Sequence, residues 1–199
     1  DGHEAVVNSA ALKLAGIDAA GPADPIGGEI ERDPKTHEPT GILKESAMGL
    51  VGRLIPEPSE AQRYEALLRA MKHANSLGVT SVHDMSAPAD VEVFRRAAAE
   101  NAMTLRITAY LSVDDWSAHL DEVVKVAHDS HSPMFALVGF KGFMDGSLGS
   151  RTAYMREPYS DATPTTPYPR GQLSAFASPQ SFRRQVVQAD AKGLQMAVH

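Results

Sequence analysis

Four parts of the sequence place side chains that can do chemistry at or just beyond the end of a predicted strand. They are Lys141, His199, the pair His83 and Asp84, and the Gly-rich turn from Asp145 to Arg151. In parallel α/β architectures the active site lies at the carboxyl ends of the strands. We therefore expect the functional side chains to be among these.

Lys141 lies inside the apolar stretch FALVGFKGF, where a charged ammonium is costly to bury without a partner. Burial lowers the pKa of a lysine and makes its neutral amine available. Three outcomes stay open. The amine can add carbon dioxide and become a carbamate that ligates a metal, it can form a Schiff base with a carbonyl substrate, or it can form an ion pair with Asp145.

The histidines and Arg151 also leave alternatives open. His199 ends the stretch LQMAVH, where it can ligate a metal or simply make a hydrogen bond within the strand. His83 can be a ligand, a substrate contact or a packed core histidine. Arg151 can bind a carboxylate or phosphate through two hydrogen bonds, or it can be part of a turn that only ends the strand. His3, in the opening DGH, does not identify a site alone. The other histidines are expected to be solvated: His37, His73, His119, His128 and His131.

Composition excludes several classes of protein. The 199 residues include no cysteine, so a metal site must use histidine, carboxylate or modified lysine. A net charge of −6 argues against nucleic acid or an anionic membrane as the main partner. No stretch approaches the roughly 20 apolar residues that span a bilayer, and no signal-peptide pattern opens the chain. We expect a cytoplasmic protein, although the chain begins at Asp1 and a leader could precede it.

The first 57 residues predict a short helix and a hairpin. The helix ends at Gly16, and two extended runs, 29–32 and 41–43, flank the turn-rich DPKTHEP. From residue 58 the pattern changes to alternating helices and strands. Ser59 and Gln62 have the spacing of a capping box. The helix that follows carries an apolar stripe: Tyr64, Leu67, Leu68 and Met71.

Four near-continuously apolar strands are predicted at 78–85, 103–111, 135–143 and 194–199. Helices are predicted between them: one at 91–101, one with a buried stripe from Trp116 to Ala127, and one from Ser178 to Gly193. Strands alternating with helices indicate a parallel sheet, either doubly wound or a (β/α)8 barrel. A complete barrel typically needs about 250 residues. Because the chain ends on a strand, we expect an internal piece of a longer polypeptide. The irregular stretch after residue 144 is long enough to suggest a functional loop.

Five segments in this order resemble the amidohydrolase superfamily: DGHEAVVNSAALKLAGI, GGEIERDPKTHEPTGILKE, GVTSVHDM, KGFMDGSLGSRTA and MAVH. The likeness is to the amidohydrolase-3 type, similar to N-substituted formamide deformylases and exoenzyme regulatory proteins. It implies an α/β fold, a partial (β/α)8 TIM-type barrel of about strands 2 to 5, with a β-hairpin insertion near the N-terminus. Residues 1–199 would be the central part of one barrel domain, with 1–57 forming the helix and hairpin and 58–199 the β/α units.

The resemblance also implies an enzyme that hydrolyses C–N bonds of a small-molecule substrate with one or two divalent ions, zinc being expected. Lys141 and His199 would be metal ligands, Asp145 would lie behind them, and His3, His83 and Arg151 would bind substrate. The general-base aspartate is expected outside this chain. No HxH pair occurs, so this piece alone is expected to be inactive. A Schiff-base lyase or aldolase using Lys141 and a non-catalytic barrel homologue are the alternatives, and the oligomeric state stays open.

Overall fold

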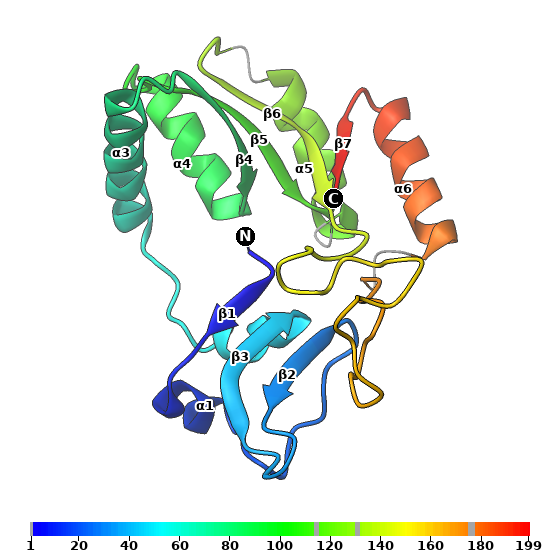
Figure 1. The fold of residues 1–199 in the computed structure, drawn as a ribbon. Helices are drawn as coiled ribbons and strands as arrows, with labels where there is room; N and C mark the ends of the chain where they lie inside the picture. The colour runs from blue at the N-terminus through cyan, green and yellow to red at the C-terminus, as the bar shows by residue number, and fades with distance from the viewer. Residues whose placement is uncertain (1, 114–115, 130–131, 175–177) are drawn as a thin grey trace. The chain divides into compact units, whose positions relative to one another are not determined.

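The computed structural model describes residues 2–113, 116–129, 132–174 and 178–199 (Figure 1). The chain divides into two compact units. Unit 1 contains residues 1–56, 143–178 and 199, and unit 2 contains residues 57–142 and 179–198. The assignment of all 199 residues to one barrel domain stays a prediction.

Unit 2 is built on a parallel sheet of four strands in the order β4-β5-β6-β7 (Figure 1). The strands are β4 (Ser81–Ser86), β5 (Arg106–Ser112), β6 (Phe135–Gly142) and β7 (Gln195–Val198). The helices are α3 (Glu60–Ser76), α4 (Pro88–Ala99), α5 (Trp116–Asp129) and α6 (Pro179–Ala191). All four predicted strands and the parallel sheet are confirmed. The described residues form no closed barrel, so the partial barrel stays a proposal.

The helices of unit 2 follow their capping signals with two corrections. Ser59 and Gln62 form the predicted capping box of α3, and Leu67 and Met71 are buried. Leu68, which was placed on the same stripe, is 38% exposed because it lies about 100° around the helix from Leu67. Helix α4 begins at Pro88 rather than at residue 91, since proline at the first helical position needs no hydrogen-bond acceptor for its nitrogen.

A β-bulge in β6 decides which face of the sheet Lys141 occupies. Leu137 pairs with Ala109 of β5, but Tyr110 pairs with Gly139 rather than with Val138. The extra residue reverses the alternation, so that Phe140 is fully buried and Lys141 pairs with Ser112. Lys141 therefore lies on the opposite face of the sheet from Leu137 and Leu111, whose side chains pack toward α4 and α5.

Unit 1 contains a three-stranded antiparallel sheet in the order β1-β3-β2. Strands β2 (Gly28–Arg32) and β3 (Pro39–Glu45) confirm the predicted hairpin, and β1 (Glu4–Val6) is a third strand that the sequence did not indicate. Helix α1 (Ser9–Ala15) ends at Gly16 as predicted, with a left-handed φ of 68°. The short elements η1 (Ser46–Met48) and α2 (Gly49–Gly52) follow β3. A core beneath the sheet contains Leu12, Ile17, Ile30, Leu43 and Ala47.

The segment 143–178 belongs to unit 1, although it follows β6 in the sequence. Its backbone is held by turns and by an isolated bridge between Asp145 and Leu173. This segment brings the GSLGSRTA motif to the N-terminal sheet. No described helix combines the length and the apolar character needed to cross a membrane.

Candidate functional site

A buried chain of polar side chains in unit 1 links three segments that are far apart in the sequence. His3 precedes β1, Glu45 ends β3, and Thr152 lies in the segment after β6. His3 Nδ1 lies 3.0 Å from Oε1 and 3.1 Å from Oε2 of Glu45. Thr152 Oγ1 donates a short hydrogen bond to Glu45 Oε1. With His3 only 6% and Thr152 1% exposed, these bonds are shielded from water, which strengthens them.

Two serine hydroxyls extend the chain behind Thr152. Ser150 Oγ lies 2.6 Å from Thr152 Oγ1, and Ser147 Oγ lies 2.9 Å from Ser150 Oγ. The backbone N–H of Ser147 donates to Thr152 Oγ1 at 3.1 Å. Thr152 Oγ1 therefore accepts hydrogen bonds on one side and donates to the Glu45 carboxylate on the other. The described contacts make Glu45 the acceptor at the end of a hydroxyl chain.

The backbone at Glu45 has an uncommon conformation. Its φ of 50° and ψ of −126° lie outside the ordinary regions for a residue with a side chain. Its N–H donates to the carbonyl of His3 at 3.0 Å, so both main chain and side chain tie Glu45 to His3. Strained conformations of this kind persist where the surrounding structure enforces them and cluster at functional sites.

His3 and His199 lie side by side in unit 1. Their ring centroids are 4.8 Å apart with an angle of 31° between the planes. Phe143 meets both rings edge-on, at 5.7 Å from His3 and 5.6 Å from His199. The carbonyl of His199 accepts a hydrogen bond from Met144 N–H at 2.9 Å. The structure thus brings together two of the predicted site residues, His3 and His199.

Lys141 belongs to unit 2, where it is partly buried on the sheet face opposite α4 and α5. Its Nζ donates to the carbonyl of Gly142 at 2.8 Å. Burial lowers the pKa of the Lys141 amine below its ordinary value of 10.5, because removal from water disfavours the charged form. A lowered pKa increases the fraction of neutral amine, which is the form that adds carbon dioxide or attacks a carbonyl.

His83 lies on the same face of the sheet as Lys141, according to the strand register. It is exposed and stacks on Tyr110 with ring centroids 5.9 Å apart. The Tyr110 hydroxyl donates to Gln195 Oε1 at 2.8 Å, across Gly139 of the intervening strand. His83 is therefore not a packed core histidine, and its assignment to substrate binding stays a prediction.

Arg151 and Asp145 have partners outside the polar chain. Arg151 is exposed and forms a short ion pair with Asp161, which occupies a guanidinium that was predicted to bind substrate. Asp145 accepts a hydrogen bond from Tyr154 N–H at 2.8 Å. The possible ion pair between Asp145 and Lys141 stays a prediction.

The remaining histidines were expected to be solvated. His37, His73 and His128 are exposed, which confirms the expectation for these three. The side chains of His119 and His131 lie outside the described residues.

Sequence reasoning missed Glu45, Thr152 and Ser150 as members of the site. Their position could have indicated a role. They lie in GILKE and GSLGSRTA, which are parts of two segments that carry the family resemblance. Gly146, in the same Gly-rich turn, lies where a side chain would not fit. A Cβ at Gly146 would lie 1.8 Å from Thr152 Oγ1 and 2.2 Å from Glu45 Oε1.

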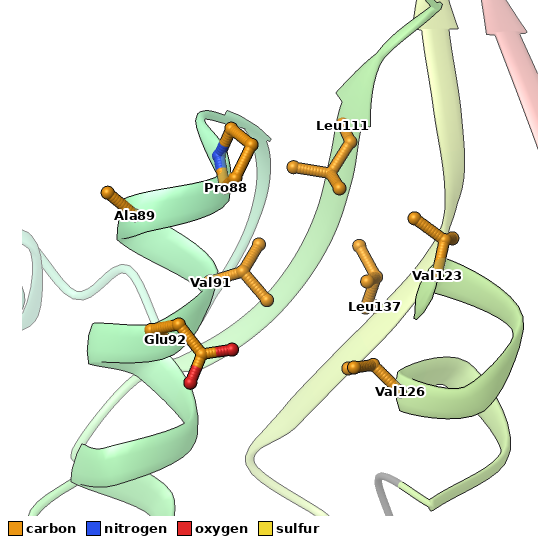
Figure 2. A pocket seen from close by; sticks show the side chains of 8 residues that line it. All are labelled: Pro88, Ala89, Val91, Glu92, Leu111, Val123, Val126 and Leu137. Carbon is orange, nitrogen blue, oxygen red and sulfur yellow. The ribbon is translucent and has the colours of Figure 1, made fainter. Parts of the chain in front are cut away.

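A cavity of about 220 Å³ in unit 2 carries no comparable chemistry. Figure 2 shows its side chains converging from α4, α5, β5 and β6. Most are aliphatic, and Glu92, the ionisable residue among them, pairs with Arg95 at 2.9 Å. This cavity belongs to the apolar layer between the helices and the sheet.

The described residues do not by themselves complete a metal centre. Within the described ranges, no three or more histidine, cysteine, aspartate or glutamate side chains form a group that could hold a metal ion. His3 Nδ1 is directed to Glu45, and the His3 ring lies beside that of His199.

Comparison with known proteins identifies the class of the chain. Residues 1–199 match the amidohydrolase family. The chain is 36% identical over 211 residues to the protein LONG AFTER FAR-RED 3 of Arabidopsis thaliana, covering 100% of this chain and 34% of that protein. It is 34% identical over 206 residues to the putative amidohydrolase YtcJ of Bacillus subtilis (strain 168), and the match covers 99% of this chain and 36% of that protein.

A solved structure agrees with these relatives. The crystal structure of an uncharacterized metal-dependent hydrolase from Pyrococcus horikoshii OT3 matches with a TM-score of 0.68 and 26% identity, over 99% of this chain and 37% of that one. The chain belongs to the amidohydrolase family, which confirms the resemblance. It spans about a third of the length of the curated relatives it matches.

Proposed function

We propose that this chain is the central part of a metal-dependent hydrolase that cleaves C–N bonds in amides, formamides or related small molecules. In this proposal β4 to β7 are strands 2 to 5 of a (β/α)8 barrel. Support comes from the family match over the whole chain and from the metal-dependent hydrolase with the similar fold. The name of the Bacillus relative, a putative amidohydrolase, points to the same bond type.

The observation that carries the proposal is the placement of Lys141. The bulge in β6 turns its side chain away from the helix-covered face, and partial burial lowers the pKa of its amine. A depressed lysine pKa is what carbamate formation needs, because only the neutral amine reacts with carbon dioxide. We propose that Lys141 and His199 ligate the metal, expected to be zinc, together with ligands that the described residues do not include.

A bound divalent ion would supply Lewis-acid polarisation of the substrate carbonyl. The residues of this chain would surround that chemistry. His3, held by Glu45, and His83, exposed on the Lys141 face, are proposed to contact substrate. Arg151 is also proposed to contact substrate, and to bind a substrate anion it would have to leave Asp161.

The test uses the full-length protein and measures bound metal and hydrolysis of formanilide. We expect stoichiometric divalent metal, hydrolysis that chelators abolish, and loss of both metal and turnover in Lys141→Ala. His73→Ala, on the exposed face of α3, should change neither and serves as the control. Absence of metal under metal-replete conditions, with no chelator-sensitive hydrolysis, would contradict the proposal.

The lowered pKa of Lys141 equally suits a Schiff-base lyase or aldolase, so the same preparation should be tested for that chemistry. In that alternative, borohydride added with a carbonyl substrate traps a covalent adduct on Lys141, and chelators have no effect. The proposed hydrolase gives no adduct. A mass measurement on the intact protein separates the two outcomes.

A further inference from the structure

A side-chain bridge crosses the parallel sheet of unit 2 on the face opposite its helices. Tyr110 of β5 pairs with Gly139 of β6, which pairs in turn with Gln195 of β7. Because Gly139 has no side chain, the Tyr110 side chain can cross β6, and its hydroxyl donates to Gln195 Oε1 at 2.8 Å. One hydrogen bond therefore links two strands that do not pair with each other.

This hydrogen bond anchors a buried aromatic ring. Tyr110 is only 6% exposed, and a buried tyrosine hydroxyl usually has a hydrogen-bond partner. Gln195, in contrast, is exposed and reaches the hydroxyl from the sheet surface. The Tyr110 ring is thus fixed at its Cβ and at its hydroxyl, so it cannot tilt away from β4 without stretching the bond to Gln195.

The orientation of His83 on β4 depends on this ring. The imidazole stacks on the Tyr110 ring with centroids 5.9 Å apart and an angle of 25° between the planes, within the range for offset-stacked aromatic pairs. Within the part of the chain that the structure describes, the His83 ring makes no hydrogen bond or ion pair. The stack on Tyr110 is therefore the contact that sets the plane of the imidazole, and both ring nitrogens stay available.

We propose that Tyr110 is a positioning residue: its ring, anchored by Gln195, holds His83 in the orientation in which the imidazole hydrogen-bonds the substrate. His83 lies on the same face of the sheet as Lys141, according to the strand register. A neutral imidazole can accept an N–H at one nitrogen or donate to a carbonyl oxygen from the other, and an amide offers both groups. The substrate half of the proposal rests on the proposed function, and the positioning half does not.

The positioning half is tested by NMR on the full-length protein with ¹³C-labelled histidine. The face of an aromatic ring shifts nearby protons to high field, so the ring protons of His83 report the stack directly. Tyr110→Leu removes the ring and gives the reference shift. We expect Tyr110→Phe and Gln195→Met, which remove the same hydrogen bond, to move the His83 signals toward this reference by similar amounts.

A double variant and an exposed site keep this test clear of folding defects. Gln195 is exposed, so Gln195→Met removes the anchor without altering the buried ring. The variant that combines Gln195→Met with Tyr110→Phe should move the His83 signals no further than either change alone, because both delete one interaction. Unchanged His83 signals in the single variants, or additive shifts in the double variant, overturn the proposal.

Tyr64→Phe is the matched control. Tyr64 belongs to the same unit, and its hydroxyl also donates to one side chain, that of Glu100, but it lies on α3 rather than in the sheet. This variant should leave the His83 signals unchanged. A similar shift in Tyr64→Phe would mean that the signals report a general loosening of unit 2, and it would overturn the proposal.

The substrate half is tested with the hydrolysis of formanilide. We expect Tyr110→Phe to raise KM about threefold to tenfold and to leave kcat within about twofold, because a contact made equally in the ground state and the transition state changes KM alone. In a His83→Ala background the same change should have no further effect, since Tyr110 acts through His83.

The two halves of the proposal can fail separately. A further rise in KM when Tyr110→Phe is added to His83→Ala would show a role independent of His83 and overturn the substrate half. If the wild type does not hydrolyse formanilide, the proposed function fails together with the substrate half, and the NMR result still decides the positioning half.

Discussion

At the scale of single residues, the motifs of this chain are connected by hydrogen bonds that only a few side chains could make. Thr152 contributes a hydroxyl that can accept and donate at once, and Glu45 contributes a carboxylate that accepts from two donors. Gly146 has no side chain, and Thr152 and Glu45 fill the space that a Cβ at this position would need. The hydrogen bonding of His3 therefore depends on residues that lie far from it in the sequence.

Gly146→Ala should separate Thr152 from Glu45 and destabilise unit 1. Overpacking a tight site typically costs about 1–3 kcal/mol, and here the contacts are with a hydroxyl and a carboxylate that cannot move apart without losing their bond. Urea denaturation measures the loss in the free energy of unfolding.

Gly52→Ala is the matched control, since nothing lies within 4 Å of the position that its Cβ would occupy. In helix α2 this change should be neutral or stabilise by up to about 1 kcal/mol. Equal stability of the Gly146→Ala variant and the wild type would show that the polar chain can rearrange freely.

At the scale of elements, the bulge in β6 is the feature that positions Lys141. Without the extra residue, strict alternation from Leu137 would put Lys141 on the face covered by α4 and α5. After the bulge, Gly139 allows β7 to approach, because a Cβ at Gly139 would lie 1.9 Å from the carbonyl oxygen of Gln195. The same short segment therefore sets the orientation of Lys141 and the pairing with the strand that leads to His199.

Gly139→Ala should weaken the pairing of β6 with β7. The clash is with backbone atoms of Gln195, so the strand itself must shift, and we expect a loss of at least about 1–3 kcal/mol. Hydrogen exchange should show faster exchange of the β7 amides, with smaller changes in β4 and β5. Gly49→Ala, at an open position of unit 1, is the control. Unchanged protection of β7 would refute this account of Gly139.

Helices α3 and α4 are joined by a surface cluster that should respond to pH. The Tyr64 hydroxyl donates to Glu100, Arg96 pairs with Glu100 at 2.9 Å, and the Arg96 guanidinium lies 4.4 Å from the Tyr64 ring centre. The hydrogen bond from Tyr64, followed by that from Arg96, lowers the pKa of the Glu100 carboxyl below its ordinary value of 4.5. The contribution to stability is therefore present above pH 4.5 and is lost as the pH falls through the lowered pKa.

Tyr64→Phe should remove most of this pH-dependent contribution. We expect the difference in melting temperature between wild type and variant to be small but measurable near pH 7 and to shrink as the pH falls through the lowered pKa of Glu100. Tyr154→Phe, whose hydroxyl has no part in the cluster, should show no such trend. A difference that stays constant across this range would mean that Glu100 is not the group involved.

At the scale of the whole molecule, metal binding by the proposed ligands Lys141 and His199 would be linked to folding. A ligand that binds only the native state stabilises it by about 2.7 kcal/mol at one hundred times its Kd. Zinc should therefore raise the free energy of unfolding of the full-length protein, and either Lys141→Ala or His199→Ala should remove that gain. His128→Ala, at the exposed end of α5, should retain it. A full zinc response in His199→Ala would remove this residue from the proposed centre.

The sequence by itself determined the types of most elements, because their signals are local. The capping box of α3, the glycine that ends α1 and the apolar runs of β4 to β7 each depend on residues close together in the chain. Strand β1 escaped notice because three residues are too few to show a period, and its only support is pairing with β3 across about forty residues.

Only the tertiary structure decided which polar residues meet. Glu45 and Thr152 are separated by 107 positions, and nothing local distinguishes them from solvated side chains. The face occupied by Lys141 depended on one bulged residue, which no periodic pattern reveals because it breaks the period. Hydrogen bonds and register across a fold are set by which segments pack together, and that is a property of the whole chain rather than of any motif.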